Sequence, residues 1–215
     1  MLNKTRAVVL KTTNYSESSL VTQLYTEHFG MQSYLITGAR KPKAKIKANI
    51  LQPLHLLEIV ATHKDNGSLQ RISEARQAPA LQEIPYDIVK SSLALFLNEI
   101  LYKILKEQEH DSYLFEFIHQ SILWLDQSHS NLANFHLVFL IKLTRFLGFY
   151  PAKSKQVLPY FNLHEATFSD SLPEHPLVLQ EPHTSIFRNL IDSEYSNCDR
   201  IKMSSSDRQF LLEKV

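Results

Sequence analysis

Hydrophobic positions in the first part of the chain come in short runs of the kind that form β-strands. Five such runs occupy residues 6–13, 20–26, 31–37, 54–62 and 69–73. In the fourth run, Leu57, Ile59 and Ala61 alternate with other positions and therefore share one face of an extended chain. Two turn signals, Phe29-Gly30 and Asp65-Asn66-Gly67, separate neighbouring runs, and Asn-Gly is a strong hairpin signal.

Five short strands with a longer insert between the third and the fourth predict a small closed barrel over residues 1–78. The pattern fits an oligonucleotide-binding (OB) barrel. An SH3-like barrel or a five-stranded meander fits the same pattern, so the strand runs alone leave these alternatives open.

The period changes to that of a helix after a linker at residues 79–84. Helical patterns cover the following segments: about 85–109, 112–126, 132–149, 184–193 and from 207 to the end. The third is apolar on nearly every side, which predicts a central, buried helix that Gly148 and Pro151 end. Four prolines predict an irregular segment at 152–182. The predicted fold class is therefore α+β, with a barrel domain at 1–78 and an all-helical domain at 79–215.

Charge is divided unevenly along the chain, although the net charge of the 215 residues is only +1. Residues 1–50 hold 8 Lys and Arg against 2 acidic residues, whereas the remainder holds 15 basic and 20 acidic residues. A basic end beside an acidic remainder suggests a polyanionic partner for the first domain.

The basic character concentrates in the insert between the third and fourth strands. Its cations are Arg40, Lys41, Lys43, Lys45 and Lys47, with no acidic residue among them. An extended chain would point the three alternating lysines to one side, as is needed to follow a phosphate backbone without reading bases. Three tyrosines on or beside the strands, Tyr15, Tyr25 and Tyr34, could stack on bases, although packing inside the barrel is the more ordinary role for each of them.

Sequence motifs for catalysis or metal binding are absent. Four glycines supply no phosphate-binding loop, and no G-x-S-x-G, H-E-x-x-H or Cys-x-x-Cys motif occurs. The histidines His164, His175 and His183 have no spacing typical of a metal site, and the single Cys198 has no base partner in the sequence. We expect a protein that is not an enzyme and has no cofactor. No apolar stretch reaches a membrane span and no signal region is present, so we expect it in the cytoplasm.

Several short segments resemble the RecO family of bacterial recombination mediators. They are Tyr15-Ser16-Glu17-Ser18-Ser19, Thr26, Gly30, Gly38-Ala39-Arg40, Leu51-Gln52-Pro53 with the strand after it, and Phe146-Leu147-Gly148-Phe149-Tyr150-Pro151. No single segment is specific, but their order and spacing cover the whole chain. The resemblance implies an OB barrel followed by a helical domain.

The resemblance also implies a function, and with it an association with the nucleoid. Members of the family bind single- and double-stranded DNA, anneal complementary strands, engage the single-stranded-DNA-binding protein SSB and the partner RecR, and help to load the RecA recombinase in the RecF pathway. By position, the DNA-contact segment implied here is residues 40–47, with Arg6, Lys11 and Tyr15 as weaker neighbours. An SSB tail, which is acidic and apolar, would need cations beside an apolar groove, and Lys142 and Arg145 are candidates.

One departure from the family concerns zinc. Many members carry a four-cysteine site after the Phe-Leu-Gly-Phe segment, whereas residues 152–170 contain no cysteine here. We therefore predict no structural zinc, and expect this segment to be held by packing of Leu158, Tyr160, Phe161, Leu163 and Phe168. Two other functions remain open at this point: an adaptor whose barrel binds only proteins, and an OB protein that binds RNA.

Overall fold

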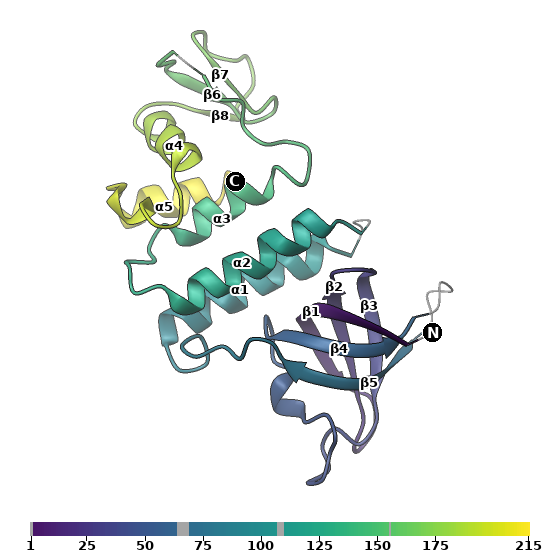
Figure 1. Cartoon of the computed structure of the whole chain (residues 1–215). Helices are drawn as coiled ribbons and strands as arrows, with labels where there is room; N and C mark the ends of the chain where they lie inside the picture. Colours follow the sequence, from purple (N-terminus) through teal and green to yellow (C-terminus); the bar gives the residue numbers. More distant parts are fainter. Residues whose placement is uncertain (1, 64–68, 107–109, 155) are drawn as a thin grey trace. The chain divides into compact units, whose positions relative to one another are not determined.

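The computed structural model describes residues 2–63, 69–106, 110–154 and 156–215. Contacts between Cα atoms divide the chain into two compact units, Met1–Ser128 and His129–Val215. The first unit holds the strands β1 to β5 and two helices that follow them in the chain (Figure 1).

The first unit contains a closed barrel with the strand order β1-β2-β3-β5-β4 (Figure 1). Its strands are β1 (Leu2–Asn14), β2 (Leu20–Thr26), β3 (Gly30–Ile36), β4 (Leu56–Thr62) and β5 (Gln70–Gln77). β1 pairs antiparallel with both β2 and β4, and β3 pairs with β5 in parallel. This arrangement confirms the OB barrel and excludes a meander, in which consecutive strands would be neighbours throughout. The predicted turn at residues 65–67 lies outside the described residues.

Alternate residues of each strand fill the barrel, as the period of two predicts. Leu57, Ile59 and Ala61 are buried in one hydrophobic cluster, which confirms the face assigned to them from the sequence. From β1, Ala7 and Val9 join the same cluster. The inward face of the barrel is thus readable from the hydrophobic pattern alone.

The limits of β4 and β5 differ from the prediction, for different reasons. β4 begins at Leu56 rather than at Leu54, because Leu54 has a φ of 58° and cannot continue a strand. β5 runs on to Gln77, four residues beyond its predicted end, through positions that are mostly exposed or half-buried. Pairing with β4 holds this polar half of β5. A hydrophobic pattern in the sequence cannot reveal such pairing.

Two helices complete the first unit. α1 (Ile88–Ile104) and α2 (Ser112–Gln127) begin after Asp87 and Asp111, whose carboxylates each accept two backbone N–H groups of the first turn. Such caps satisfy donors that the helix itself cannot pair. Both helices are confirmed, although residues 107–109, to which the sequence extended the first, lie outside the described residues.

A buried carboxylate fixes the linker between the barrel and α1. Asp126, only 4% exposed, accepts the backbone N–H groups of Gln82, Glu83 and Ile84 at 2.8–2.9 Å. Lys90 is equally buried, and its ammonium donates to the Glu83 carboxylate and to the carbonyl of Asp126. The linker is therefore attached to the first turn of α1 and to the last turn of α2.

The second unit is built around α3 (Phe135–Leu143), with α4 (His183–Asp192) and α5 (Ser205–Leu212) packed on it. Seven of the nine α3 residues are buried, which confirms the predicted central helix. Its predicted end at Phe149 is wrong. After Leu143 the chain continues in tight turns, until Gly148, at a φ of 83°, lets the Phe149 N–H reach the Thr144 carbonyl.

The prediction of an irregular segment at 152–182 is also wrong. It contains a small antiparallel sheet of β6 (Tyr160–Asn162), β7 (Thr167–Ser169) and β8 (Val178–Leu179), in the order β7-β6-β8. Strands of two or three residues are too short to show a period in the sequence. Phe161 is buried with its ring centroid 4.8 Å from that of Phe168 and 4.7 Å from that of Phe187, so aromatic packing does hold this segment.

Replacing Asp126 by Ala should destabilise the protein strongly. Three buried N–H groups lose their acceptor, and we expect a loss of about 3–5 kcal/mol in the free energy of unfolding. The matched control is Asp87→Ala, which removes an exposed helix cap and should cost about 1 kcal/mol. Urea unfolding monitored by circular dichroism measures both, and equal losses would contradict the role given to Asp126.

The stability of the second unit should fall in mild acid because of His136. Burial, and then the charge of Arg208, lower the pKa of His136 from 6.5 to about 4. Between these two pKa values the unfolded chain binds a proton that the folded chain does not. The stability that depends on a neutral His136 is therefore fully present above a pH of about 7 and decreases as the pH falls toward 4. His136→Gln cannot titrate. We expect its urea midpoint to fall less than that of the wild type between pH 7.5 and 4.5, and parallel losses would contradict the assignment.

Candidate nucleic-acid interface

The basic insert forms a loop between β3 and β4, at the lower end of the barrel in Figure 1. Two of its side chains, Ala39 and Ile46, are buried in the barrel's hydrophobic cluster. The N–H of Ala48 donates to the carbonyl of Ala39 at 3.3 Å, which closes the base of the loop. Residues 40–47 are therefore held at both ends by the barrel.

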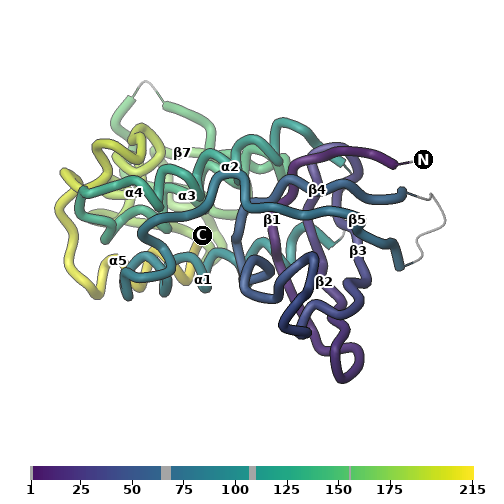
Figure 2. Tube along the Cα trace, turned by 60° about the horizontal axis from the view of Figure 1, so that its bottom comes forward, coloured from purple at the N-terminus to yellow at the C-terminus, as the bar shows by residue number. Residues whose placement is uncertain are grey.

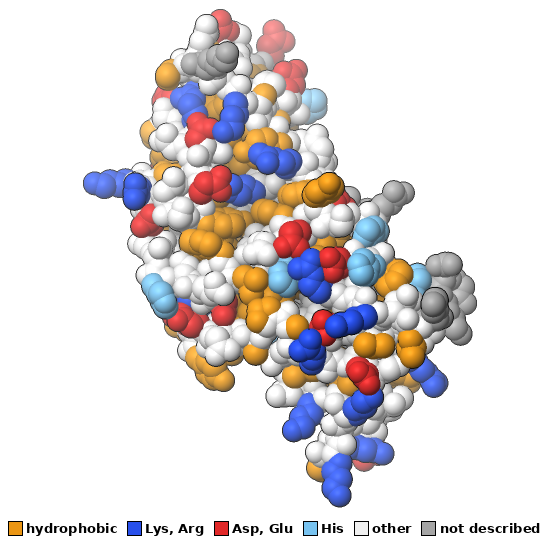
Figure 3. All heavy atoms as spheres, in the orientation of Figure 1, with side chains coloured by type: hydrophobic (Ala, Val, Ile, Leu, Met, Phe, Trp, Pro, Cys, Tyr) orange, Lys and Arg blue, Asp and Glu red, His pale blue; other side chains and the backbone are white. Residues whose placement is uncertain are grey.

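All five cations of this loop are exposed; they are Arg40, Lys41, Lys43, Lys45 and Lys47. Figure 3 shows that Lys and Arg side chains gather over this end of the barrel. The backbone runs through turns and bends, with the N–H of Lys41 bonded to Gly38 and that of Ala44 to Lys41. The extended conformation that would align all three alternating lysines is thus not adopted. The chain keeps the cations outward instead because Ala39 and Ile46 face inward.

One loop cation has a carboxylate partner. Lys45 lies 3.1 Å from a carboxylate oxygen of Glu74 on β5, and their side chains are 71% and 64% exposed. An ion pair this exposed contributes little stability and exchanges easily. The other four cations of the loop have no carboxylate partner among the residues that the structure describes. A polyanion would therefore meet mostly unneutralised charge.

The turn between β1 and β2 adjoins the loop, as the purple and blue segments at the bottom of Figure 2 show. The N–H of Arg40 donates to the carbonyl of Ser18 at 3.3 Å. In this turn Ser16 accepts the N–H of Ser19, and the side chain of Tyr15 is 64% exposed. The turn thus places an exposed aromatic ring near the attachment of the loop.

The other two tyrosines cannot stack on bases in this structure. Tyr25 and Tyr34 are at most 1% exposed, and burial raises the pKa of both phenols to about 12. Tyr25 packs near Phe115 of α2. Both tyrosines are core residues, and packing inside the protein is the more ordinary of the two roles considered from the sequence.

Arg6 is occupied by protein carboxylates. Its guanidinium donates to both carboxylate oxygens of Glu27 at 2.7 and 2.9 Å and to Glu116 of α2 at 2.7 Å. The hydrogen bonds that Arg6 donates to Glu27 raise the pKa of Arg6 and lower the pKa of Glu27. Arg6 therefore joins the barrel to α2, a role that the sequence did not reveal because the partner lies 110 positions away.

Lys142 and Arg145, the residues considered for a protein partner, do not lie on one helix. Lys142 is in the last turn of α3 and pairs with Glu194 at 2.7 Å, whereas Arg145 follows the helix and lies over the Tyr150 ring at 4.5 Å. Both cations thus already have partners within the second unit.

The polar residues considered for metal or nucleophilic chemistry are dispersed. The rings of His164 and His175 are 5.9 Å apart, while His183 pairs with Asp207. Across the described ranges no group of three His, Cys, Asp or Glu residues is placed to hold a metal ion. Cys198 is buried, and burial raises the pKa of its thiol to about 11, which suits a structural thiol.

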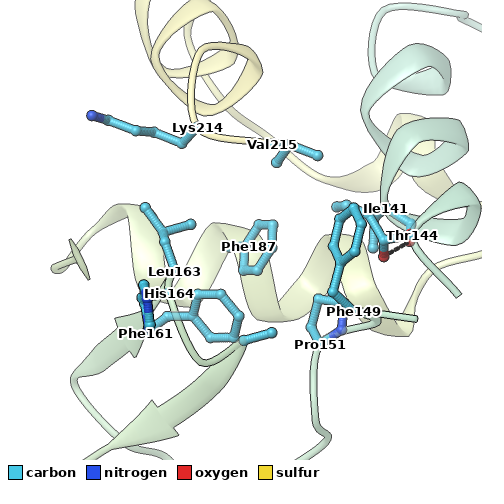
Figure 4. A pocket seen from close by; sticks show the side chains of 11 residues that line it. Ile141, Thr144, Phe149, Pro151, Phe161, Leu163, His164, Phe187, Lys214 and Val215 are labelled. Carbon is cyan, nitrogen blue, oxygen red and sulfur yellow. Dashed lines mark hydrogen bonds between the residues drawn. The ribbon is translucent and has the colours of Figure 1, made fainter. Parts of the chain in front are cut away.

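The second unit also contains an apolar pocket of about 310 Å³ between α3, α4, β6 and the end of the chain (Figure 4). Phe149, Phe161 and Phe187 contribute to its walls, and the ammonium of Lys214 points away from its interior (Figure 4). Its lining residues with polar side chains are Thr144, His164 and Lys214. None of the described helices is long and apolar enough to cross a membrane.

Comparison with known proteins agrees with this architecture. Residues 1–79 match the family model for the N-terminal part of recombination protein O, and residues 85–214 match that for its C-terminal part. The chain is 37% identical to the DNA repair protein RecO of Flavobacterium psychrophilum, over 98% of this chain and 87% of the relative. It is 39% identical to that of Bacteroides fragilis, over 97% and 87% of the two chains. The chain therefore belongs to the RecO family of DNA repair proteins.

Proposed function

We propose that the protein is a non-enzymatic mediator of DNA repair that binds DNA through the basic loop at residues 40–47 and anneals complementary strands. The observation that carries this proposal is the set of five exposed cations on a loop whose base is closed by the Ala48–Ala39 hydrogen bond. Membership of the RecO family supports a role in DNA repair and recombination. It suggests DNA as the polyanion that the charge of the loop fits.

The loop would bind phosphates rather than bases. Lysine and arginine side chains on turns supply charge without the fixed array of donors that base recognition requires, so we expect affinity with little sequence preference. Binding would release counterions and weaken as salt rises. If all five cations contact single-stranded DNA, the slope of log affinity against log salt is about −3.5.

Annealing follows from the same charge. Two complementary strands repel each other, and a cationic surface that holds both lowers this repulsion. The exposed ring of Tyr15, beside the loop, would add stacking on an unpaired base at about 1–3 kcal/mol. No step in this process breaks a covalent bond, so none requires a catalytic residue.

The protein partners implied by the family remain part of this proposal. We infer that the chain engages SSB and RecR and assists RecA loading on SSB-coated single strands. An acidic SSB tail that used Lys142 would have to displace Glu194, which now holds its ammonium at 2.7 Å. Arg145 is more exposed and would need only to leave the ring of Tyr150.

The DNA site is tested by neutralising the loop. The variant carries Gln at Arg40, Lys41, Lys43, Lys45 and Lys47, and the matched control carries Gln at five exposed cations elsewhere: Lys103, Lys153, Arg200, Lys202 and Lys214. We measure fluorescence anisotropy of a labelled 20-nucleotide strand over a salt series. We expect a steep slope for the wild type and the control, and a slope shallower by about 3.5 for the loop variant.

Three results would contradict the proposal. Equal slopes for the loop variant and the control would remove the loop from the site. No binding by the wild type at low salt would favour an adaptor that binds only proteins. Tighter binding to structured RNA than to single-stranded DNA would favour an RNA-binding OB protein.

The SSB site is tested by charge reversal. The double variant Lys142→Glu, Arg145→Glu should lose affinity for a labelled acidic SSB-tail peptide by at least tenfold, because two attractions become repulsions. The control is Lys153→Glu, which breaks another ion pair of the second unit, Lys153 with Asp192 at 2.8 Å. Unchanged peptide affinity in a variant with a normal thermal melt would remove Lys142 and Arg145 from the site.

A further inference from the structure

A second group of cations lies where β1 meets α1. The ammonium of Lys11 on β1 lies 4.9 Å from the ring centroid of Tyr102 on α1, and that of Lys106, just beyond α1, lies 4.2 Å from the same centroid. Both lysines are exposed, and Tyr102 is half-buried. Residues nearly a hundred positions apart thus bring two like charges to one aromatic ring.

A β-bulge creates this arrangement. The register of β1 against β2 shifts between Val9 and Lys11, so Leu10 is an extra residue in β1. Leu10 is buried, and its carbonyl accepts the side-chain amide of Asn98 of α1 at 2.9 Å. Bulges re-aim the side chains beside them. The bulge and the Asn98 bond therefore fix the position from which Lys11 reaches Tyr102.

The electrostatics of this group favour an anion. Burial raises the pKa of the Tyr102 phenol, but hydrogen bonding and charge from Lys106 and Lys11 outweigh burial and lower it. Within the described ranges, no carboxylate pairs with either lysine. Two neighbouring ammonium groups repel each other, and an anion placed between them would remove that repulsion.

Lys11 lies on the strand that leads into the turn to which the basic loop is attached. Lys11 precedes Tyr15 by four residues, which is roughly 13 Å along a strand, and Ser18, bonded to Arg40, is three residues further. Thr13, Asn14 and Tyr15 are exposed and uncharged, so no acidic side chain lies between Tyr15 and Lys11. The one acidic residue between Lys11 and Ser18 is Glu17, in the turn.

We propose that a DNA strand held by the basic loop continues along the end of β1 and places a further phosphate at the group formed by Lys11, Tyr102 and Lys106. This inference rests on the proposed function, because it requires that the loop binds DNA. It extends the site from the barrel onto α1. It also makes contact with this group depend on strand length.

Length dependence gives the test. Four phosphates of a pentanucleotide can all be held by the five loop cations, whereas a 20-nucleotide strand has enough length to cover both areas. The variant is Lys11→Gln with Lys106→Gln. The control is Lys4→Gln with Lys103→Gln, which removes the same charge from exposed lysines of the same unit. Salt-series anisotropy is measured with oligothymidylates of 5 and 20 nucleotides.

With the 20-nucleotide strand we expect a slope shallower by about 1.4 for the variant, at 0.7 for each lost contact, and weaker binding at low salt. With the pentanucleotide the variant should equal the wild type, and the control should equal it with both strands. Lys106→Gln alone leaves β1 intact and should change the slope by about 0.7, which keeps the test valid if the double variant does not fold.

Two outcomes would overturn the inference while leaving the proposed function intact. An unchanged slope with the 20-nucleotide strand would mean that no phosphate reaches Lys11 and Lys106. Equal losses with both strands would place these residues within the primary loop site rather than further along the strand. Failure of the wild type to bind either oligonucleotide would overturn the proposed function itself and this inference with it.

Discussion

The pairing of β1 with two strands at once is the constraint on which the first unit depends. Its first half bonds to β4, from Leu2 opposite Thr62, and its second half to β2, ending with Asn14 opposite Leu20. Together with the parallel pairing of β3 and β5, these two ladders close the barrel. They also set the positions of three features: Arg6 against α2, the bulge at Leu10 against α1, and the turn that holds the basic loop.

Closure of the barrel explains why a loop of turns can present charge in a defined place. Ala39 and Ile46 are part of the same buried cluster as Val9 and Ile59, so the loop shares the stability of the barrel interior. Its cations contribute nothing to that interior and remain available to a ligand. Arg6 shows the opposite case, because the carboxylates of Glu27 and Glu116 already neutralise it.

Much of the fold could be predicted from periodicity, because the five barrel strands and the helices each bury one face or, for α3, nearly all faces. The strands β6 to β8 could not, since two or three residues show no period. In the candidate site, the basic run could be recognised from the sequence because its five cations follow one another closely. The partners of Arg6 and Lys11 could not be recognised, because Glu116 and Tyr102 approach them only through the tertiary fold. Which tyrosine is exposed depends on strand register, and only the structure separates Tyr15 from Tyr25 and Tyr34.

The strand order also has a consequence for how the chain folds during synthesis. The partners Leu2 and Thr62 are 60 positions apart, and β3 gains its neighbour β5 only from Gln70 onward. Contacts that span so much sequence form slowly. A chain that emerges from the ribosome N-terminus first can form the β1–β2–β3 hairpins early but cannot close the barrel until β5 has been made. The basic loop is therefore synthesised before the strands that complete its support, so its cations are present before the barrel that holds them is finished.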